Sequence, residues 1–406
     1  MAITINTTPE LYTLGGNPVE FNISSTNSSQ PNFKYIVDLY DSTAVLQTRI
    51  KLNKDIDNTA TVDVGRLLNS LLAANIVTFG DGETECPKLT ESGVVQYSID
   101  FGEEYGSTPV IYSSLTNSGT KYVIYGGLNP LEFNNFLYTN YALDTSTRLF
   151  LKKTNYGRSS SGPIIIRSGE WDLASYLVLS HNQAYRMRVI TTDTLGSQTS
   201  SNFLLAYATI SSNIRKIQTI PTGFNINNLT GFGVTQPIIS ATDTVSYTVQ
   251  IFDNASVASS EMLYFKVDSS CSKGDEYRFQ WLNELGGYDG FTFKAANRPK
   301  LDIERKTYKI DATLTNSFTA NIDYYNRIQD KITVQSDWLT NDQAEYLSGL
   351  LSSPQIYHLY QDGSVDGIYR RMRITDTSYE IKKVENDKLF NLTLTLQPSY
   401  THTRLL

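Results

Sequence analysis

The aromatic stretch at residues 277–293, YRFQWLNELGGYDGFTF, constrains the fold more than any other part of the chain. Each of its halves alternates large apolar side chains with small or polar ones at a period of two, which is typical of half-buried β-strands. Gly286 and Gly287 lie between the halves and permit the positive φ that a tight reversal requires. The stretch therefore predicts an aromatic β-hairpin.

This hairpin has two possible local roles. In the first, it is part of a core, and Trp281, Phe291 and Phe293 anchor the C-terminal half of the chain. In the second, its two glycines form a binding cleft. An upstream strand at residues 262–268 is expected to pair with the hairpin, and a downstream strand at residues 307–314 is expected to extend the same sheet.

The composition favours strands over helices. Among 406 residues, 27 are Tyr and 17 are Phe, and only 18% are charged. Aromatic and β-branched residues fit pleated sheets, while Ser and Asn are typical of turns. We expect a mainly β protein with two or three antiparallel β-sandwich-like domains and a few short helices. The formal net charge of −7, without a cluster of Lys and Arg, argues against nucleic acid as the main partner.

Turn signals and hydrophobic periodicity divide the chain into three units. Residues 1–125 are expected to form an N-terminal β-sandwich of the fibronectin type III kind. Residues 126–210 form a second β-rich part with long loops, and residues 211–406 form a C-terminal β domain with one helix at about 340–352. The spacing of Thr340 and Gln343 predicts a capping box at the start of that helix.

Shorter elements are expected at three further places. Residues 64–74 space their leucines as one face of a helix, with Asp63 as its N-cap. Residues 170–178 are expected to form a helical turn. Residues 388–397 alternate as the last strand, with one apolar face that must be buried.

Residues for catalysis or metal binding do not form a recognisable constellation. Residues 362–367, DGSVDG, place oxygen ligands as the start of a calcium loop does, but Arg373 occupies the position of the bidentate Glu. Paired carboxylates occur without a nucleophile elbow or a phosphate-binding loop. The three histidines are scattered and lack zinc-ligand spacing to a cysteine: His181, His358 and His402. We therefore expect no enzyme activity, no cofactor and no metal.

The cysteines and the apolar runs bear on where the protein is made. Cys86 and Cys271 are far apart, so no disulfide framework is expected, although one long-range disulfide stays open as an alternative. No basic segment precedes an apolar core at the N-terminus, and no apolar run reaches the ~18 residues of a membrane span. We expect assembly in a cytoplasm and no membrane partner.

Three tyrosines are candidates for an interface. Tyr138, Tyr141 and Tyr156 lie among Asn, Thr and Gly, and not in alternating strands. Tyr is enriched at protein interfaces because it buries a large area and keeps a polar tip. The alternative is that these rings belong to a β-rich core. We favour an exposed or interfacial role, and we expect residues 129–162 to contact a neighbouring subunit.

Several segments resemble one family. The run CSKGDEYR and the following WLNELGGYDGF resemble a segment of virion proteins from phages that infect Bacteroidetes, including crAss-like phages. Segments at both ends of the chain fit the same resemblance, which therefore touches both ends and the middle. The segments that carry the resemblance are residues 17–19, 30–35, 271–278, 281–291, 373–383 and 386–390.

The resemblance implies a function for the chain. It implies a structural subunit of an oligomeric tail, ring or baseplate in the virion, built from β-sandwiches. The implied partners are copies of the chain itself and neighbouring tail or portal proteins. The alternative is a receptor- or glycan-binding tail module for host attachment, with its site in the Tyr- and Asn-rich middle part.

Overall fold

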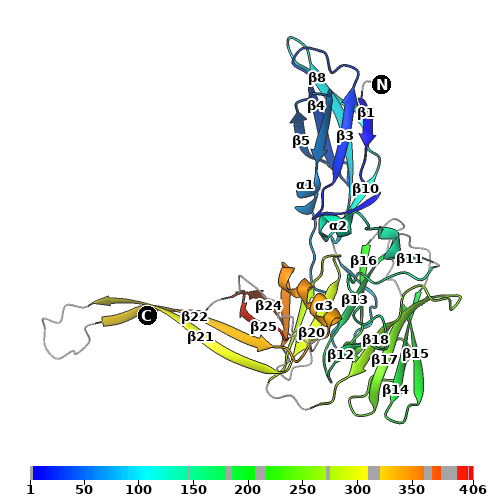
Figure 1. The fold of residues 1–406 in the computed structure, drawn as a ribbon, viewed down its shortest axis with the longest axis vertical. Coiled ribbons are helices and arrows are strands. Elements are labelled where there is room, and N and C mark those ends of the chain that lie inside the picture. The colour runs from blue at the N-terminus through cyan, green and yellow to red at the C-terminus, as the bar shows by residue number, and fades with distance from the viewer. Residues whose placement is uncertain are drawn as a thin grey trace.

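A computed structural model describes residues 3–90, 92–144, 146–178, 185–205, 216–270, 275–309, 321–360, 368–375, 391–400 and 402–405. The chain is mainly β, with several sheets and a few short helices, as expected from its composition. Figure 1 shows an upright N-terminal sandwich, a larger body below it, and a narrow arm that projects sideways from the body.

Two sheets face each other in the N-terminal sandwich. Phe21, Tyr35 and Phe101 are fully buried between the sheets, in the core that holds them together. The first sheet has the order β1-β3-β6 and contains β1 (Ile3–Thr7), β3 (Glu20–Ser25) and β6 (Thr59–Asp63). The second has the order β2-β10-β8-β4-β5, with β9 also paired to β8, and contains β2 (Tyr12–Leu14), β4 (Lys34–Asp41), β5 (Leu46–Leu52), β8 (Val94–Tyr105), β9 (Val110–Asn117) and β10 (Lys121–Ile124).

The body begins with two further sheets. Their strand pairing crosses the division that we expected at residue 210, because strands from both sides of it share each sheet. The four-stranded sheet has the order β11-β13-β16-β7 and contains β7 (Lys88–Thr90), β11 (Ala142–Leu143), β13 (Leu173–Val178) and β16 (Lys216–Pro221). The five-stranded sheet has the order β12-β18-β17-β14-β15 and contains β12 (Ile164–Ile166), β14 (Tyr185–Asp193), β15 (Gln198–Leu205), β17 (Thr244–Asp253) and β18 (Leu263–Val267).

The largest sheet lies in the C-terminal half. It contains the predicted aromatic hairpin, which forms as β19 and β20. The expected pairing of residues 262–268 with this hairpin is wrong, because β18 pairs with β12 and β17 while β19 pairs with β23. The sheet has the order β20-β19-β23-β24-β25-β22-β21, with β26 also paired to β22, and contains β19 (Tyr277–Leu282), β20 (Tyr288–Phe293), β21 (Ala296–Lys309), β22 (Asn321–Gln335), β23 (Ile356–Tyr360), β24 (Ile368–Ile374), β25 (Thr393–Pro398) and β26 (His402–Leu405).

The longest helix is α3 (Asn341–Ser352), and its predicted capping box is confirmed. The Thr340 side chain accepts from the Gln343 backbone, and the Gln343 side chain accepts from the backbone N–H of Thr340. The helix expected at residues 64–74 is only α1 (Gly65–Asn69). Asp63 is not its N-cap as expected: the N-cap is Val64, without a side-chain cap bond. Asp63 lies one residue earlier, and its Oδ1 accepts from the backbone N–H groups of Gly65 and Val19.

The helical turn expected at residues 170–178 is wrong. Every residue of β13 is buried, and a fully buried strand has no polar alternation to distinguish it from a helix in sequence. The other short helices among the described residues are α2 (Pro130–Phe133), η1 (Tyr138–Asn140) and η2 (Phe224–Asn228).

The aromatic hairpin packs into the main core. Trp281 and Phe293 are fully buried, as core anchors must be, and Phe291 is half-buried against the same cluster. A Cβ on Gly286 would lie 2.3 Å from the Tyr125 carbonyl oxygen, and one on Gly287 would lie 2.4 Å from the Leu151 carbonyl oxygen. The two glycines therefore permit close backbone approach, and they do not line an open cleft.

Candidate functional site

A buried guanidinium joins the body to the aromatic hairpin. Arg278 on β19 lies 2.8 Å from Asp172 Oδ1 and 3.3 Å from Glu170 Oε2, and all three side chains are nearly inaccessible to solvent. Arg278 also donates to the Trp171 carbonyl oxygen. Burial opposes the charge of the guanidinium, but Glu170 and Asp172 raise its pKa. This arrangement is a fixed ion network, since each carboxylate already has a buried cationic partner.

A second buried pair lies beside the first. Lys152 Nζ is 3.1 Å from Asp289 Oδ1, and Asn283 donates to the other oxygen of that carboxylate at 3.1 Å. Burial works against the ammonium, but Asp289 and Asp172 together raise the pKa of Lys152. The two pairs connect two loops of the body, before and after β12, to both strands of the hairpin, so they fix the body and the C-terminal sheet to each other.

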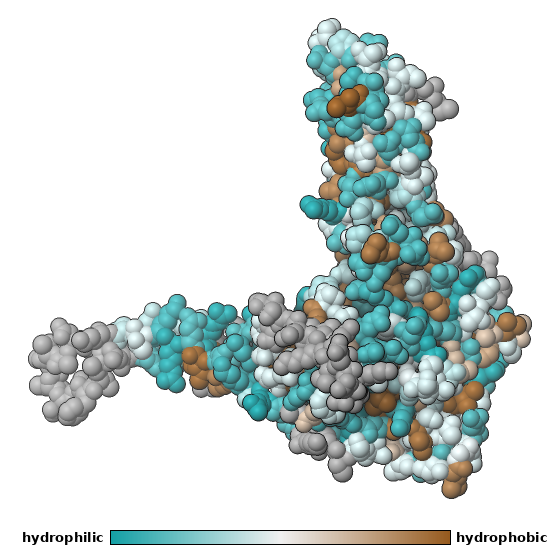
Figure 2. Space-filling model, in the orientation of Figure 1, coloured by the Kyte–Doolittle hydropathy of each residue, from teal (hydrophilic) through white to brown (hydrophobic). Residues whose placement is uncertain are grey.

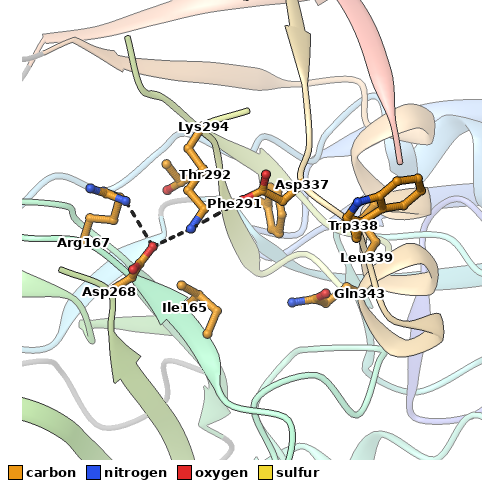
Figure 3. A pocket seen from close by; sticks show the side chains of 10 residues that line it. All are labelled: Ile165, Arg167, Asp268, Phe291, Thr292, Lys294, Asp337, Trp338, Leu339 and Gln343. Atoms are coloured by element: carbon orange, nitrogen blue, oxygen red, sulfur yellow. Dashed lines mark hydrogen bonds and ion pairs between the residues drawn. The ribbon is translucent and has the colours of Figure 1, made fainter. Parts of the chain in front are cut away.

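A small pocket of about 200 Å³ opens at the junction of the body and the C-terminal sheet (Figure 3). Lys294 Nζ lies 2.7 Å from Asp268 and 3.5 Å from Asp337, and Arg167 reaches Asp268 at 3.1 Å. Burial opposes the charge of Asp268, but hydrogen bonds from Lys294 and Ser270 keep the pKa of this carboxyl below its ordinary value. The charged groups of the pocket thus form an interlinked chain.

The rim of the pocket carries an exposed aromatic ring. The side chain of Trp338 is 64% exposed, which is unusual for a residue with so much apolar area. In Figure 3, Trp338 and Gln343 lie on the α3 side of the pocket, opposite Asp268. A flat exposed ring can stack on a ligand, while the neighbouring amide and carboxylate oxygens can accept hydrogen bonds from it.

The arm is formed by β21 and β22, with β26 paired along part of β22. Its two faces differ. Cross-strand partners in an antiparallel pair share a face, so Leu301 and Ile303 lie on the same face as Ile328, the partner of Ile303. Leu301 is 52% exposed and Ile303 is 43% exposed. Pro299 and its partner Ile332 continue the same row, and Asp330, the partner of Leu301, interrupts it. We call this mainly apolar row the apolar face of the arm.

Ion pairs cover the opposite face of the arm. Asp302 lies 2.9 Å from Lys300 and 2.7 Å from Lys331, and Glu304 lies 4.0 Å from Arg327. Figure 2 shows the result: an apolar patch stands on the arm among hydrophilic surface. The sequence prediction missed the arm, and part of the strand expected at residues 307–314 lies outside the described residues.

The predicted interface tyrosines are all engaged within the chain. Tyr156 is only 3% exposed, so the expectation that it is exposed is wrong: its ring lies 4.8 Å from that of Tyr346, and its hydroxyl accepts from the Ile165 backbone. Tyr138 and Tyr141 are half-buried against the apolar cluster that joins the N-terminal sandwich to the body. Tyr138 packs on Tyr12, with ring centroids 4.3 Å apart.

Within the described part of the chain, no group of three or more His, Cys, Asp or Glu side chains could hold a metal ion. Residues 362–367, Cys271 and His181 lie outside the described residues. Cys86 is a buried free thiol, and burial raises its pKa. None of the described helices is both long and apolar enough to cross a membrane.

Comparisons with known proteins leave the chain without an assigned family. No protein-family model matches it, and no curated protein matches it. Among solved structures, it is similar to the native conformation of alpha-2-macroglobulin from E. coli, with 8% identity and a TM-score of 0.19. That match covers 100% of this chain, which spans only 32% of the length of its neighbour. A similarity at this level carries no argument about fold or function.

Proposed function

We propose that this chain is a structural subunit of an oligomeric tail, ring or baseplate assembly in a bacteriophage particle, without a catalytic role. The observation that carries the proposal is the arm. It projects from the body and leaves Leu301 and Ile303 uncovered in a mainly apolar row of side chains. Contiguous exposed apolar surface of this kind marks a site of association, because covering it removes that area from water.

Two further observations support a structural role. The resemblance of the segments around residues 271–291 and at both ends of the chain points to virion proteins. The buried carboxylates of Glu170, Asp172 and Asp289 each face Arg278 or Lys152, whereas a general acid or base must reach its substrate. Ion pairs of this kind suit a subunit that must keep one shape.

Proteomics of purified virions tests the proposal. Particles produced by the genome that encodes this chain should contain it at a fixed number of copies, and a reconstruction should place it in a symmetric ring or a baseplate. A particle that lacks the chain, while the infected cell contains it, contradicts the proposal.

The Trp338 pocket favours one second candidate, a receptor- or glycan-binding tail module. The exposed ring and the neighbouring Asp337 and Gln343 would supply stacking and hydrogen bonds to a sugar. Binding to a glycan array that is lost in Trp338→Ala, with Trp171→Phe as a control away from the pocket, would support this candidate. Equal binding by Trp338→Ala and the unchanged protein would remove it.

A further inference from the structure

The arm is too long and too thin to cover its own apolar face. At ~3.3 Å per residue, the 14 residues of β21 extend roughly 46 Å. Most of that length is a ribbon of two or three strands, and a ribbon without a packed layer is marginally stable in water. A layer from elsewhere must cover the apolar face if the arm is to be rigid.

The distribution of charge along the chain favours the N-terminal sandwich as the surface that covers the apolar face of the arm. The two strands of the arm contain seven Lys and Arg residues against four Asp and Glu residues, and the connecting residues 310–320 add a single Asp. The sandwich is formed by residues 1–75 and 92–125, because β7 and the loop before it belong to the body. These residues contain ten Asp and Glu residues against six Lys and Arg residues, so the N-terminal sandwich has an excess of four negative charges. Complementary charge of this kind steers association and selects the partner surface.

The sandwich also offers a suitable strand. Among the described residues, β9 pairs only with β8, so it lies at an edge of its sheet. Seven of its eight residues are exposed. Near its end, the Thr116 side chain donates to the Ile3 carbonyl oxygen of β1, but the outward side chains of β9 stay uncovered and can contact an apolar face. The exposed large apolar side chains of β9 are Val110, Ile111, Tyr112 and Leu115.

We propose that the apolar face of the arm docks on the N-terminal sandwich of a second copy of this chain, along β9. This inference rests on the proposed function and names the surfaces through which the copies join. The arm projects sideways from the body and is clear of the upright sandwich of its own subunit, so the two surfaces meet only between different copies (Figure 1). A contact between two different surfaces repeats from subunit to subunit, and it closes into a ring when the rotation fits.

Variants on the two faces of the arm test the docking. We compare the double variant Leu301→Ser and Ile303→Ser with the matched control Lys300→Ser and Glu304→Ser, which changes the opposite face of the same strand. Sedimentation velocity over a concentration series should show at least a tenfold loss of association for the first variant and less than a threefold loss for the control. Added salt should weaken association of the unchanged protein, because the attraction between opposite charges is screened.

Disulfide trapping identifies the partner surface. In a Cys271→Ser background, protein with Ile303→Cys is mixed with protein carrying Leu115→Cys on β9 and oxidised with diamide. The expected product is a cross-linked dimer of the two proteins. Protein with Leu195→Cys, whose position is 89% exposed on the turn between β14 and β15, is the control and should give little product.

Three results would overturn the docking. These are equal association of the two arm variants, equal cross-linking to the β9 and Leu195 positions, and a protein that stays monomeric at every concentration. None of them changes whether the chain is present in purified virions, so the proposed function stands or fails separately.

Discussion

Two hairpins follow one another directly in the chain, and their environments are opposite. β19–β20 is short and aromatic, and most of its residues are buried. β21–β22 is more than twice as long, and the described residues of β21 are nearly all exposed. Both belong to the same sheet, separated only by Lys294 and Ala295. Strand pairing alone therefore does not decide how a hairpin is held.

The difference shows where each hairpin obtains its stability. The aromatic hairpin is packed by α3 and β13 and is held by the buried Arg278 and Lys152. The arm has cross-strand pairs and exposed ion pairs, which contribute only ~0–1 kcal/mol each. The first hairpin supports the fold of the subunit, while the second offers its free face to other molecules.

The largest effect is expected at Trp281. Its ring is fully buried and lies 5.1 Å from that of Tyr346 on α3, so Trp281→Ala should lower the free energy of unfolding by ~3–5 kcal/mol. Urea unfolding followed by circular dichroism measures this. Trp338→Ala is the matched control, because that ring is mostly exposed, and it should cost less than ~1 kcal/mol. If Trp281→Ala lowered the free energy of unfolding as little as Trp338→Ala does, the aromatic hairpin would not be a core element.

A comparison of ion pairs sharpens the contrast. Arg278→Ala leaves two carboxylates buried without their cation, and breaking such a network typically costs ~3–5 kcal/mol. Arg327→Ala on the arm removes an exposed partner of Glu304 and should cost at most ~1 kcal/mol. Thermal unfolding of both variants at pH 7 gives the two values. A mild effect of Arg278→Ala would show that water or another cation replaces the guanidinium.

Acid should weaken the aromatic hairpin before it affects the arm. His358 on β23 is the cross-strand partner of Phe279, and burial, followed by the nearby Arg370, lowers its pKa from 6.5 to about 4. The unfolded chain therefore binds a proton at a higher pH than the folded chain, and stability falls as the pH drops from 6.5 to about 4. At about 1.4 kcal/mol per pKa unit, the loss reaches about 3 kcal/mol. On the arm, hydrogen bonds from Lys331 and Lys300 lower the pKa of Asp302, so its ion pairs persist.

The measurement is urea unfolding between pH 7 and pH 4, for the unchanged protein and for His358→Gln. The Gln variant cannot gain a charge, so its stability should depend less on pH over this window. Parallel curves for the two proteins would assign the acid sensitivity to other groups.

The sequence predicted the elements whose pattern is local. The alternation in residues 277–293 and the capping box at Thr340 and Gln343 both describe neighbouring residues, and both are found in the structure. Partner choice was not predictable, because a period of two does not say which edge of a hairpin another strand will join. The expected partner at residues 262–268 and the observed partner β23 both have this pattern.

The candidate surfaces were harder to predict for two physical reasons. Arg278 and its carboxylates lie more than 100 residues apart, and no sequence spacing records that proximity. The arm did carry a signal, because Lys300, Asp302 and Glu304 alternate with Leu301 and Ile303. Pro299 and the high charge weaken that signal, since Pro and charged residues are depleted in central strands.

The smallest effect is expected on the arm itself. Leu301 and Ile303 are exposed and lie outside the buried clusters of the subunit. Changing both to Ser should therefore alter the free energy of unfolding by no more than ~0.5 kcal/mol per site. Unfolding is measured at a dilution where the protein is monomeric, so that association adds nothing to stability.

The core pair Leu394→Ser and Leu396→Ser is the control, since both side chains are buried on β25, and it should unfold the protein or come close to it. A large loss from the arm variant would mean that the apolar face is covered within the subunit. A negligible loss would mean that this face does not serve the fold of the monomer and is free for a contact with another molecule.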